Sequence, residues 1–363
     1  MKIEELTLKK KIGQMMIIRL QGKEVSKQVI KMIKEYNIGG IVLYRKNYDT
    51  YEEMENLINK IIRINKECNN IPLFICVDQE GGRVNRMPYE IKNLRSARKI
   101  ADKNDLELVK KAGKVTAEML KKSGFNMDFA PVLDIQRFED NHAIGNRCYG
   151  DSIEEVSKNA LEVMYQLSKG GVIPVVKHFP GHGATLKDSH WFLPRIDKDI
   201  KQLEIEDMVP FENAIKQNAE VIMVGHLKIK SVDKRTPASL SKNIINNYLI
   251  NKYNYKGLIM TDDLKMRAIS LWYGYARACL KACKAGNDLI LIGTPYYIVK
   301  RAIRKIERNV KLGLIDEKDI EKRVEKIVKL KEKYNIENEF ACGCDINKIN
   351  EEIEEINEKI EQA

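Results

Sequence analysis

The chain contains 363 residues, of which 44% are hydrophobic and 32% are charged. This length and composition exclude a mainly disordered protein and allow one large domain or two small ones. Lysine and arginine exceed the acidic residues by 63 − 52 = 11, but no basic stripe with interleaved aromatic residues accompanies that charge, so we expect neither a nucleic-acid nor a membrane partner.

Eight short apolar runs, rich in β-branched residues, alternate with stretches of helical periodicity such as 102–124 and 152–170. Nearly continuous apolar runs are typical of parallel strands that are covered on both faces. In chain order the runs lie at 12–18, 39–44, 73–78, 127–135, 172–179, 221–226, 257–263 and 288–293. This α/β pattern predicts a single (β/α)8 TIM-type barrel. A doubly wound open sheet is the alternative, but no GxGxxG follows the first run.

The C-terminal residues differ from the rest of the chain. Their isoleucines follow a 3-4-3-4 spacing, which predicts a short C-terminal amphipathic helix. Residues 345–363 hold seven acidic and two basic residues. We therefore divide the chain into a barrel domain over 1–337 and an acidic tail helix over 338–363. We expect this helix to dock on the basic body, or alternatively to pair with a second copy, so that the protein is a monomer or a weak dimer.

The apolar runs, the N-terminal residues and the cysteines indicate where the protein is located and whether its thiols are reduced. No apolar run reaches the ~18 residues of a membrane span, and Glu4 and Glu5 stand where a signal peptide carries positive charge. We therefore expect a cytoplasmic protein. The seven cysteines are scattered, which predicts reduced thiols rather than a disulfide framework. We expect no metal and no cofactor.

Three of the five histidines, His178, His182 and His190, lie between residues 177 and 190, after the fifth apolar run. In a (β/α)8 barrel the active site lies at the C-terminal ends of the strands, where this segment falls. With Asp188 these histidines could bind zinc, but the helical HExxH pattern is absent. Asp188 can instead accept a ring N–H of His190 and make it a general acid/base. A histidine satisfied by a local hydrogen bond is the alternative.

Asp262 and Asp263 stand side by side at the end of the seventh run. Strand alternation should point one of them into the barrel mouth and the other away. Asp262 is a candidate nucleophile, metal ligand or substrate clamp, and Lys177 nearby would keep it ionised. Asp263 fits the N-cap of the following helix better.

The segment VDQEGGRVNRM places Asp78 at the end of the third run, followed by a glycine turn, Arg83 and Arg86. Aspartate and arginine at a rim can hold a polyhydroxylated ligand through acceptors and forked donors. A structural ion pair is the alternative. Arg147, in GNRCYG after the fourth run, adds another donor.

Six motifs in order, VDQEGGRVNR, APVLDI, GNRCYG, KHFPGHG followed by TLKDSH, PASLS and GLIMTDDLKM, resemble those of the β-N-acetylglucosaminidases (β-N-acetylhexosaminidases) of glycoside hydrolase family 3. The resemblance extends to about residue 335. The second α/β domain of the family's β-glucosidases is absent, which favours the hexosaminidase branch over a β-glucosidase. A metal-dependent hydrolase built on the histidines is the other alternative.

The resemblance implies a retaining exo-acting enzyme that forms a covalent glycosyl-aspartyl intermediate. It assigns Asp262 as the nucleophile, His190 as the acid/base and Asp188 as its partner. It also assigns the binding of the N-acetylglucosamine unit to Asp78, Arg86, Arg147, Lys177 and His178.

The implied substrate is a small carbohydrate with a terminal β-linked N-acetylglucosamine, on a muropeptide or a chitooligosaccharide, in peptidoglycan recycling or turnover. An uncharged histidine base would repel an incoming anion less than a carboxylate, which leaves phosphorolysis open as a side activity. The chain departs from the family pattern at Cys148, Ala184 and Arg277, none of them a catalytic position.

Overall fold

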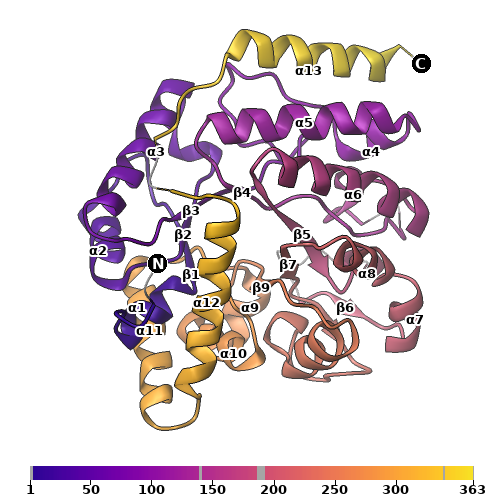
Figure 1. Cartoon of the computed structure of the whole chain (residues 1–363). Coiled ribbons are helices and arrows are strands. Elements are labelled where there is room, and N and C mark those ends of the chain that lie inside the picture. The colour runs from indigo at the N-terminus through magenta and orange to yellow at the C-terminus, as the bar shows by residue number, and fades with distance from the viewer. Residues whose placement is uncertain (1–2, 139–140, 186–192, 338–339, 363) are drawn as a thin grey trace.

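Eight parallel strands form one sheet around which the helices are arranged (Figure 1). The structure is a computed structural model, and it describes residues 3–138, 141–185, 193–337 and 340–362. The strands are β1 Met16–Arg19, β2 Gly40–Val42, β3 Phe74–Val77, β4 Met127–Asp128, β5 Ile173–Phe179, β7 Val221–Val224, β9 Leu258–Thr261 and β10 Ile290–Ile292. Seven of the eight predicted runs contain one of these strands, and the run over 12–18 overlaps β1, which ends at Arg19.

The strand order around the sheet is β10-β1-β2-β3-β4-β5-β7-β9, so the strands follow the order along the chain and the last one, β10, lies beside the first. In β1, Ile18 pairs with Ile41 of β2 on one side and with Ile292 of β10 on the other. A parallel bridge between Met260 and Leu289 joins β9 to the chain just before β10 and nearly closes the sheet. The (β/α)8 TIM-type barrel predicted from the sequence is confirmed. A separate two-stranded sheet pairs β6 (Arg195–Ile196) with β8 (Lys228–Ile229).

Helices cover the outside of the barrel, and their capping residues follow from the sequence. For example, the Thr50 hydroxyl accepts the backbone N–H of Glu53 at the start of α3, and Glu53 returns a side-chain bond to the cap. The helices are α1 Leu8–Gln14, α2 Lys27–Tyr36, α3 Tyr51–Lys66, α4 Ala97–Ala101, α5 Leu106–Lys122, α6 Ile153–Lys169, α7 Ile200–Ile205, α8 Val209–Lys216, α9 Arg267–Tyr273, α10 Tyr275–Ala285, α11 Tyr296–Lys311, α12 Glu317–Lys333 and α13 Ile346–Glu361. A π-helical segment, Asn243–Lys252, takes the place of an α-helix between β7 and β9.

Two predicted runs are only partly strands. The run over 12–18 begins inside α1, which the Thr7 hydroxyl caps, and β1 starts only at Met16. Apolar helix ends and buried strands cannot be separated by periodicity over so few residues. The run over 127–135 yields only β4, because Pro131 has no N–H for a continuous ladder. Val132 then makes an isolated parallel bridge with Lys177.

The C-terminal segment forms α13, which lies along α5 on the outside of the barrel (Figure 1). Its isoleucines Ile349, Ile353, Ile356 and Ile360 are buried. All seven cysteines lie within the described residues and are free thiols. No helix of the described residues is long and apolar enough to cross a membrane.

Candidate active site

A pocket of about 410 Å³ opens at the C-terminal ends of the barrel strands. Six of the sequence-predicted site residues line it: Asp78, Arg86, Arg147, Lys177, His178 and Asp262. They come from segments up to 184 residues apart and meet because parallel strands bring their C-terminal ends to one face. The other two predicted residues, Asp188 and His190, lie outside the described residues.

Lys177 on β5 lies between two carboxylates. Its Nζ is 2.5 Å from an oxygen of Asp78 and 2.5 Å from an oxygen of Glu80, and its side chain is 2% exposed. Burial lowers the pKa of Lys177, but the charges of Asp78 and Glu80 outweigh this effect and raise it above its ordinary value. Lys177 is therefore a permanently charged group in the pocket wall.

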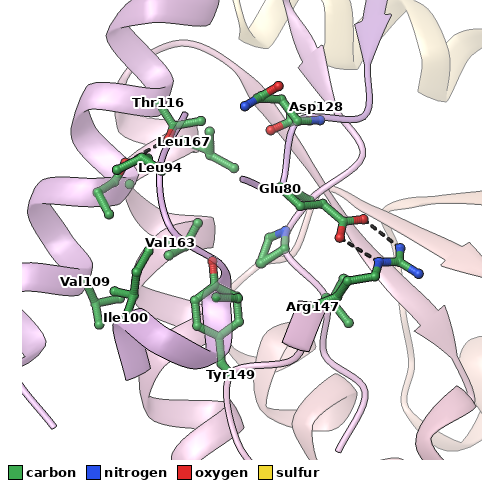
Figure 2. Close-up of a pocket in the computed structure, with 17 residues that line it drawn as sticks. Glu80, Leu94, Ile100, Val109, Thr116, Asp128, Arg147, Tyr149, Val163 and Leu167 are labelled. Carbon is green, nitrogen blue, oxygen red and sulfur yellow. Dashed lines mark hydrogen bonds and ion pairs between the residues drawn. The ribbon is translucent and has the colours of Figure 1, made fainter. Parts of the chain in front are cut away.

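Glu80 continues this network toward Arg147. The Nε and Nη2 atoms of Arg147 donate to the two carboxylate oxygens of Glu80 at 2.7 and 2.6 Å (Figure 2). Burial raises the pKa of Glu80, but Arg147 and then Lys177 outweigh it and hold this pKa well below its usual range. Arg147 thus lines the pocket, and its guanidinium is largely committed to Glu80 and to the carbonyl of Ala143. The sequence analysis did not single out Glu80.

A second, small cavity of about 20 Å³ lies beside this ion pair, between the barrel and the helices outside it (Figure 2). It has room for about one water molecule. Asp128 lines it and accepts the backbone N–H of Gln79 at 2.9 Å, while its other carboxylate oxygen is buried with no partner among the described residues. Burial raises the pKa of Asp128 well above its ordinary value. Burial thus favours the neutral form of Asp128, whereas Arg147 and Lys177 favour the ionised form of Glu80.

Arg86 lies near Oδ2 of Asp78, whereas Lys177 bonds to Oδ1. Its Nη2 is 3.5 Å from Asp78, and its backbone N–H donates to the side chain of Gln79 at 2.7 Å. Tyr44, which the sequence analysis missed, lines the pocket next to it. The guanidinium groups of Arg19 and Arg86 lie 4.2 and 5.7 Å from the centre of the Tyr44 ring. The pocket wall thus combines forked donors, a carboxylate and an aromatic face.

Asp134 is bonded to two of the histidines, His178 and His182. Its carboxylate lies 2.7 Å from Nδ1 of His178 and accepts the backbone N–H of His182 at 2.6 Å. Burial would raise the pKa of Asp134, but His178 and these hydrogen bonds lower it. The bond to Nδ1 fixes the His178 ring and leaves Nε2 for another partner. Asp134 was visible in APVLDI as a polar strand end, although the sequence analysis gave it no role.

His182 is neutral at physiological pH. Burial, and then the nearby His178, lower its pKa to about 4. Its Nδ1 lies 3.0 Å from the hydroxyl of Thr185. Among the described residues no group of three or more His, Cys, Asp or Glu side chains could hold a metal ion. The predicted alternative of a zinc site also needs His190 and Asp188, which lie outside those residues.

Asp262 and Asp263 have different surroundings. One oxygen of Asp262 accepts the backbone N–H of Asp263 at 2.7 Å, and among the described residues no side chain forms an ion pair with it. Burial raises the pKa of Asp262, but His226 and then His178 outweigh this and lower it, so it is ionised.

Asp263 instead fixes the turn after β9. Its carboxylate accepts the backbone N–H groups of Lys265 and Gly293 at 2.9 and 2.8 Å. The expectation that Asp263 caps the next helix is wrong, because α9 begins at Arg267 and Met266 occupies its N-cap position. Three residues, Leu264 to Met266, lie between Asp263 and the first residue of α9, which the sequence pattern did not reveal.

Comparison with known proteins agrees with this geometry. The family model for the glycosyl hydrolase family 3 N terminal domain matches residues 7–330. A β-hexosaminidase of Methylobacillus flagellatus is 30% identical over 277 residues, covering 75% of this chain and 78% of that protein. A β-hexosaminidase of Haemophilus influenzae is 31% identical, covering 76% and 78%.

A solved structure is similar over almost the whole chain. It is the family 3 β-N-acetylglucosaminidase of a Paenibacillus species, with a TM-score of 0.91 and 33% identity, covering 98% of this chain and 69% of that one. The family model, the sequence identities and the fold all point to the same family. The chain belongs to glycosyl hydrolase family 3 and is a glycoside hydrolase.

Proposed function

We propose that the enzyme is a retaining exo-β-N-acetylglucosaminidase with Asp262 as its nucleophile. The relatives named above as β-hexosaminidases and as a β-N-acetylglucosaminidase support the substrate class. The observation that carries the proposal is the state of Asp262, which is an ionised carboxylate in the pocket. A nucleophile has to be ionised and has to keep an oxygen available for the anomeric carbon.

The other described carboxylates of this region are already engaged. Asp78 and Glu80 are bound to Lys177, and Asp134 is bound to His178. The fourth, Asp263, accepts two backbone N–H groups, and burial raises its pKa. Asp262 is therefore the best placed of them for attack.

The proposed reaction has two displacements. The Asp262 carboxylate forms a bond to C1 of the sugar as the C1–O bond to the leaving group breaks, and His190 donates its proton to the leaving oxygen. Water then attacks C1, His190 takes its proton, and the bond to Asp262 breaks. Asp188 holds the His190 ring and stabilises its charged form. The roles of His190 and Asp188 rest on the motif TLKDSH.

Sugar binding is the proposed role of the charged network. Lys177, Asp78 and Arg86 present a cation, an acceptor and a forked donor to the pocket, which suits the hydroxyl groups of one sugar ring. His178, with its Nδ1 held by Asp134, presents Nε2 to the same ring. Arg147 acts chiefly by holding Glu80 against Lys177.

We further propose that the natural substrates are muropeptides or chitooligosaccharides and that the enzyme serves peptidoglycan turnover in the cytoplasm. The excess of 11 positive charges would favour an acidic aglycone such as a peptide-bearing saccharide. Its test is a comparison of kcat/KM on muropeptides and on chitooligosaccharides. A higher value on the muropeptides would support the preference for an acidic aglycone.

Release of a phenol from an aryl β-N-acetylglucosaminide, beside the matching β-glucoside and with EDTA present, tests the function. We expect selective cleavage of the N-acetyl substrate. Cleavage of the glucoside instead would favour a β-glucosidase, and loss of activity only with EDTA would favour a metal-dependent hydrolase. The Asp262→Asn variant should lose at least ~10³-fold in kcat, while the exposed Asp102→Asn serves as the matched control.

A further inference from the structure

Two asparagines of α13, Asn350 and Asn357, are bonded to the backbone of residues 90–95, which we call the 90–95 segment. The side-chain oxygen of Asn350 accepts the N–H of Lys92 at 2.7 Å, and its nitrogen donates to the carbonyl of Glu90 at 2.8 Å. Asn357 repeats this arrangement with the N–H of Arg95 and the carbonyl of Asn93, both at 3.0 Å. Each side chain therefore makes the pair of bonds that a neighbouring β-strand would make.

The sequence of α13 explains why these bonds form together. Asn350 and Asn357 are seven residues apart, about two helical turns, so both lie on one side of the helix. Each asparagine directly follows a buried isoleucine, Ile349 or Ile356, of the face that packs α13 against the body of the protein. The amide group carries a donor and an acceptor on one planar end, as a peptide bond does. Ion pairs between Lys92 and Glu354 and between Arg95 and Glu361 flank the contact, but they are exposed and contribute little.

The 90–95 segment is bonded in turn to the loop that follows β3. The side chain of Asn93 donates to the carbonyl of Gly82 at 2.6 Å, and the N–H of Gly82 donates to the carbonyl of Leu94 at 2.8 Å. Gly82 has φ +53°, and a Cβ there would lie 2.8 Å from that of Ser96. The backbone of Gly82 is therefore held closely against the same 90–95 segment to which Asn350 and Asn357 are bonded.

Gly82 lies in the turn 80–86, which supplies the pocket with charged groups. The turn is closed by hydrogen bonds from the N–H of Glu80 to the carbonyl of Val84 and from the N–H of Val84 to the carbonyl of Gly81. Glu80, at its start, meets Lys177 and Arg147, and Arg86, at its end, meets Asp78. A shift of the turn would displace both ends of the charged network.

We propose that α13 positions the sugar-binding turn 80–86, with Asn350 and Asn357 as positioning residues that act through the 90–95 segment. The proposal deepens the proposed function and rests on it for its choice of substrate. Asp78 and Arg86 would bind the sugar in the ground state and in the transition state alike. Loosening the turn should therefore raise KM more than it lowers kcat.

The test is the double variant Asn350→Leu with Asn357→Leu in the full chain, which removes the four hydrogen bonds and keeps the isoleucines. On an aryl β-N-acetylglucosaminide at 25 °C we expect KM to rise roughly tenfold and kcat to stay within about twofold. In hydrogen exchange followed by mass spectrometry, the peptide over 79–86 should exchange at least about tenfold faster.

Two controls separate positioning from loss of stability. Asn347→Leu makes the same change on an exposed part of α13, and Ile303→Val removes one methyl group from the buried face of α11. Both should leave KM and the exchange of 79–86 at the wild-type values. If the double variant only lowers the melting temperature, with wild-type KM and wild-type exchange in 79–86, the proposal is wrong.

Hydrogen exchange in residues 79–86 tests the role of α13 independently of the proposed function. If the wild type cleaves no N-acetylglucosaminide, the proposed function fails while exchange in 79–86 still decides the coupling. Faster exchange there in the double variant supports it, and unchanged exchange overturns it.

Discussion

The two ends of the barrel each bury a lysine, and the two lysines behave in opposite ways. Lys177, at the C-terminal end, is 2% exposed, and Lys331, at the N-terminal end, is fully buried. The pKa of Lys177 is raised, because Asp78 and Glu80 outweigh its burial. Burial lowers the pKa of Lys331 from its ordinary value of 10.5 to about 7.

The bonding partners of the two lysines account for the difference between their pKa values. Lys331 donates to the side-chain oxygen of Gln14 at 3.0 Å and to the carbonyl of Gly39 at 3.1 Å, and it lies 4.5 Å from the centre of the Phe74 ring. No ion pair to a carboxylate joins it among the described residues. Burial alone thus drives a lysine toward its neutral form, whereas two carboxylates keep it charged. Lys177, in the wall of the pocket, is held in its charged form, whereas burial favours the neutral form of Lys331 at the other end of the barrel.

The largest expected effect comes from removing the charged lysine. Lys177→Met leaves Asp78 and Glu80 without their shared cation, so we expect the free energy of unfolding to fall by ~3–5 kcal/mol. Urea unfolding at pH 7 measures this, and activity on the aryl substrate should be lost as well. An unfolding free energy like that of the wild type would show that the network is not coupled as described.

Lys331 should instead make the free energy of unfolding depend on pH. The pKa of Lys331 is depressed in the folded state, so between about pH 7 and 10.5 the unfolded chain binds more protons than the folded one. Stability should therefore rise with pH in this window, by about 1.4 kcal/mol per pH unit from this residue, and Lys331 should add no slope below it. The difference between wild type and Lys331→Met, measured by urea unfolding from pH 7.5 to 9, isolates the effect. A difference that does not change with pH would contradict a depressed pKa.

At pH 7 the same Lys331→Met variant should be slightly more stable than the wild type. It gives up two hydrogen bonds but relieves the cost of burying a charge, and we expect a net gain of roughly 1 kcal/mol. Thermal unfolding beside Lys177→Met makes the comparison direct. Equal losses in both variants would mean that pairing does not distinguish the two ends.

The smallest effect should come from Asp128. Burial raises the pKa of Asp128 well above its ordinary value, which favours the neutral carboxyl group. Asp128→Asn should therefore change the unfolding free energy by less than ~1 kcal/mol. Glu80→Gln, the same neutralisation at an ionised carboxylate, serves as the matched comparison and should cost ~3 kcal/mol or more. If Asp128→Asn is as damaging as Glu80→Gln, Asp128 is ionised.

The sequence was sufficient for the barrel and for much of the pocket. Apolar runs followed by a polar residue mark strand ends, and a barrel gathers those ends on one face. For this reason the pattern of residues alone places Asp78, Lys177, His178 and Asp262 together. The division of the chain at residue 337 stays a prediction.

Contacts between side chains that are far apart in the sequence could not be predicted from the sequence pattern. Glu80 looks like a solvated loop carboxylate until it meets Arg147, which is 67 residues away. Lys331 stands between Lys329 and Lys333 in a helix that reads as a charged surface, and only packing shows that it is the buried one. Tyr44 likewise gives no sign of the two arginines beside it. Each of these depends on tertiary contacts rather than on local pattern.

The most direct test of the account is to trap the glycosyl-enzyme. An N-acetylglucosaminyl fluoride with a second fluorine at C5 has a good leaving group, and it slows the hydrolysis of the intermediate. After incubation and digestion, mass spectrometry should find the sugar on the peptide that contains Asp262, and Asp262→Asn should prevent the labelling. A sugar attached at another carboxylate, or rapid turnover that gives the inverted anomer with no adduct, would contradict Asp262 as the nucleophile.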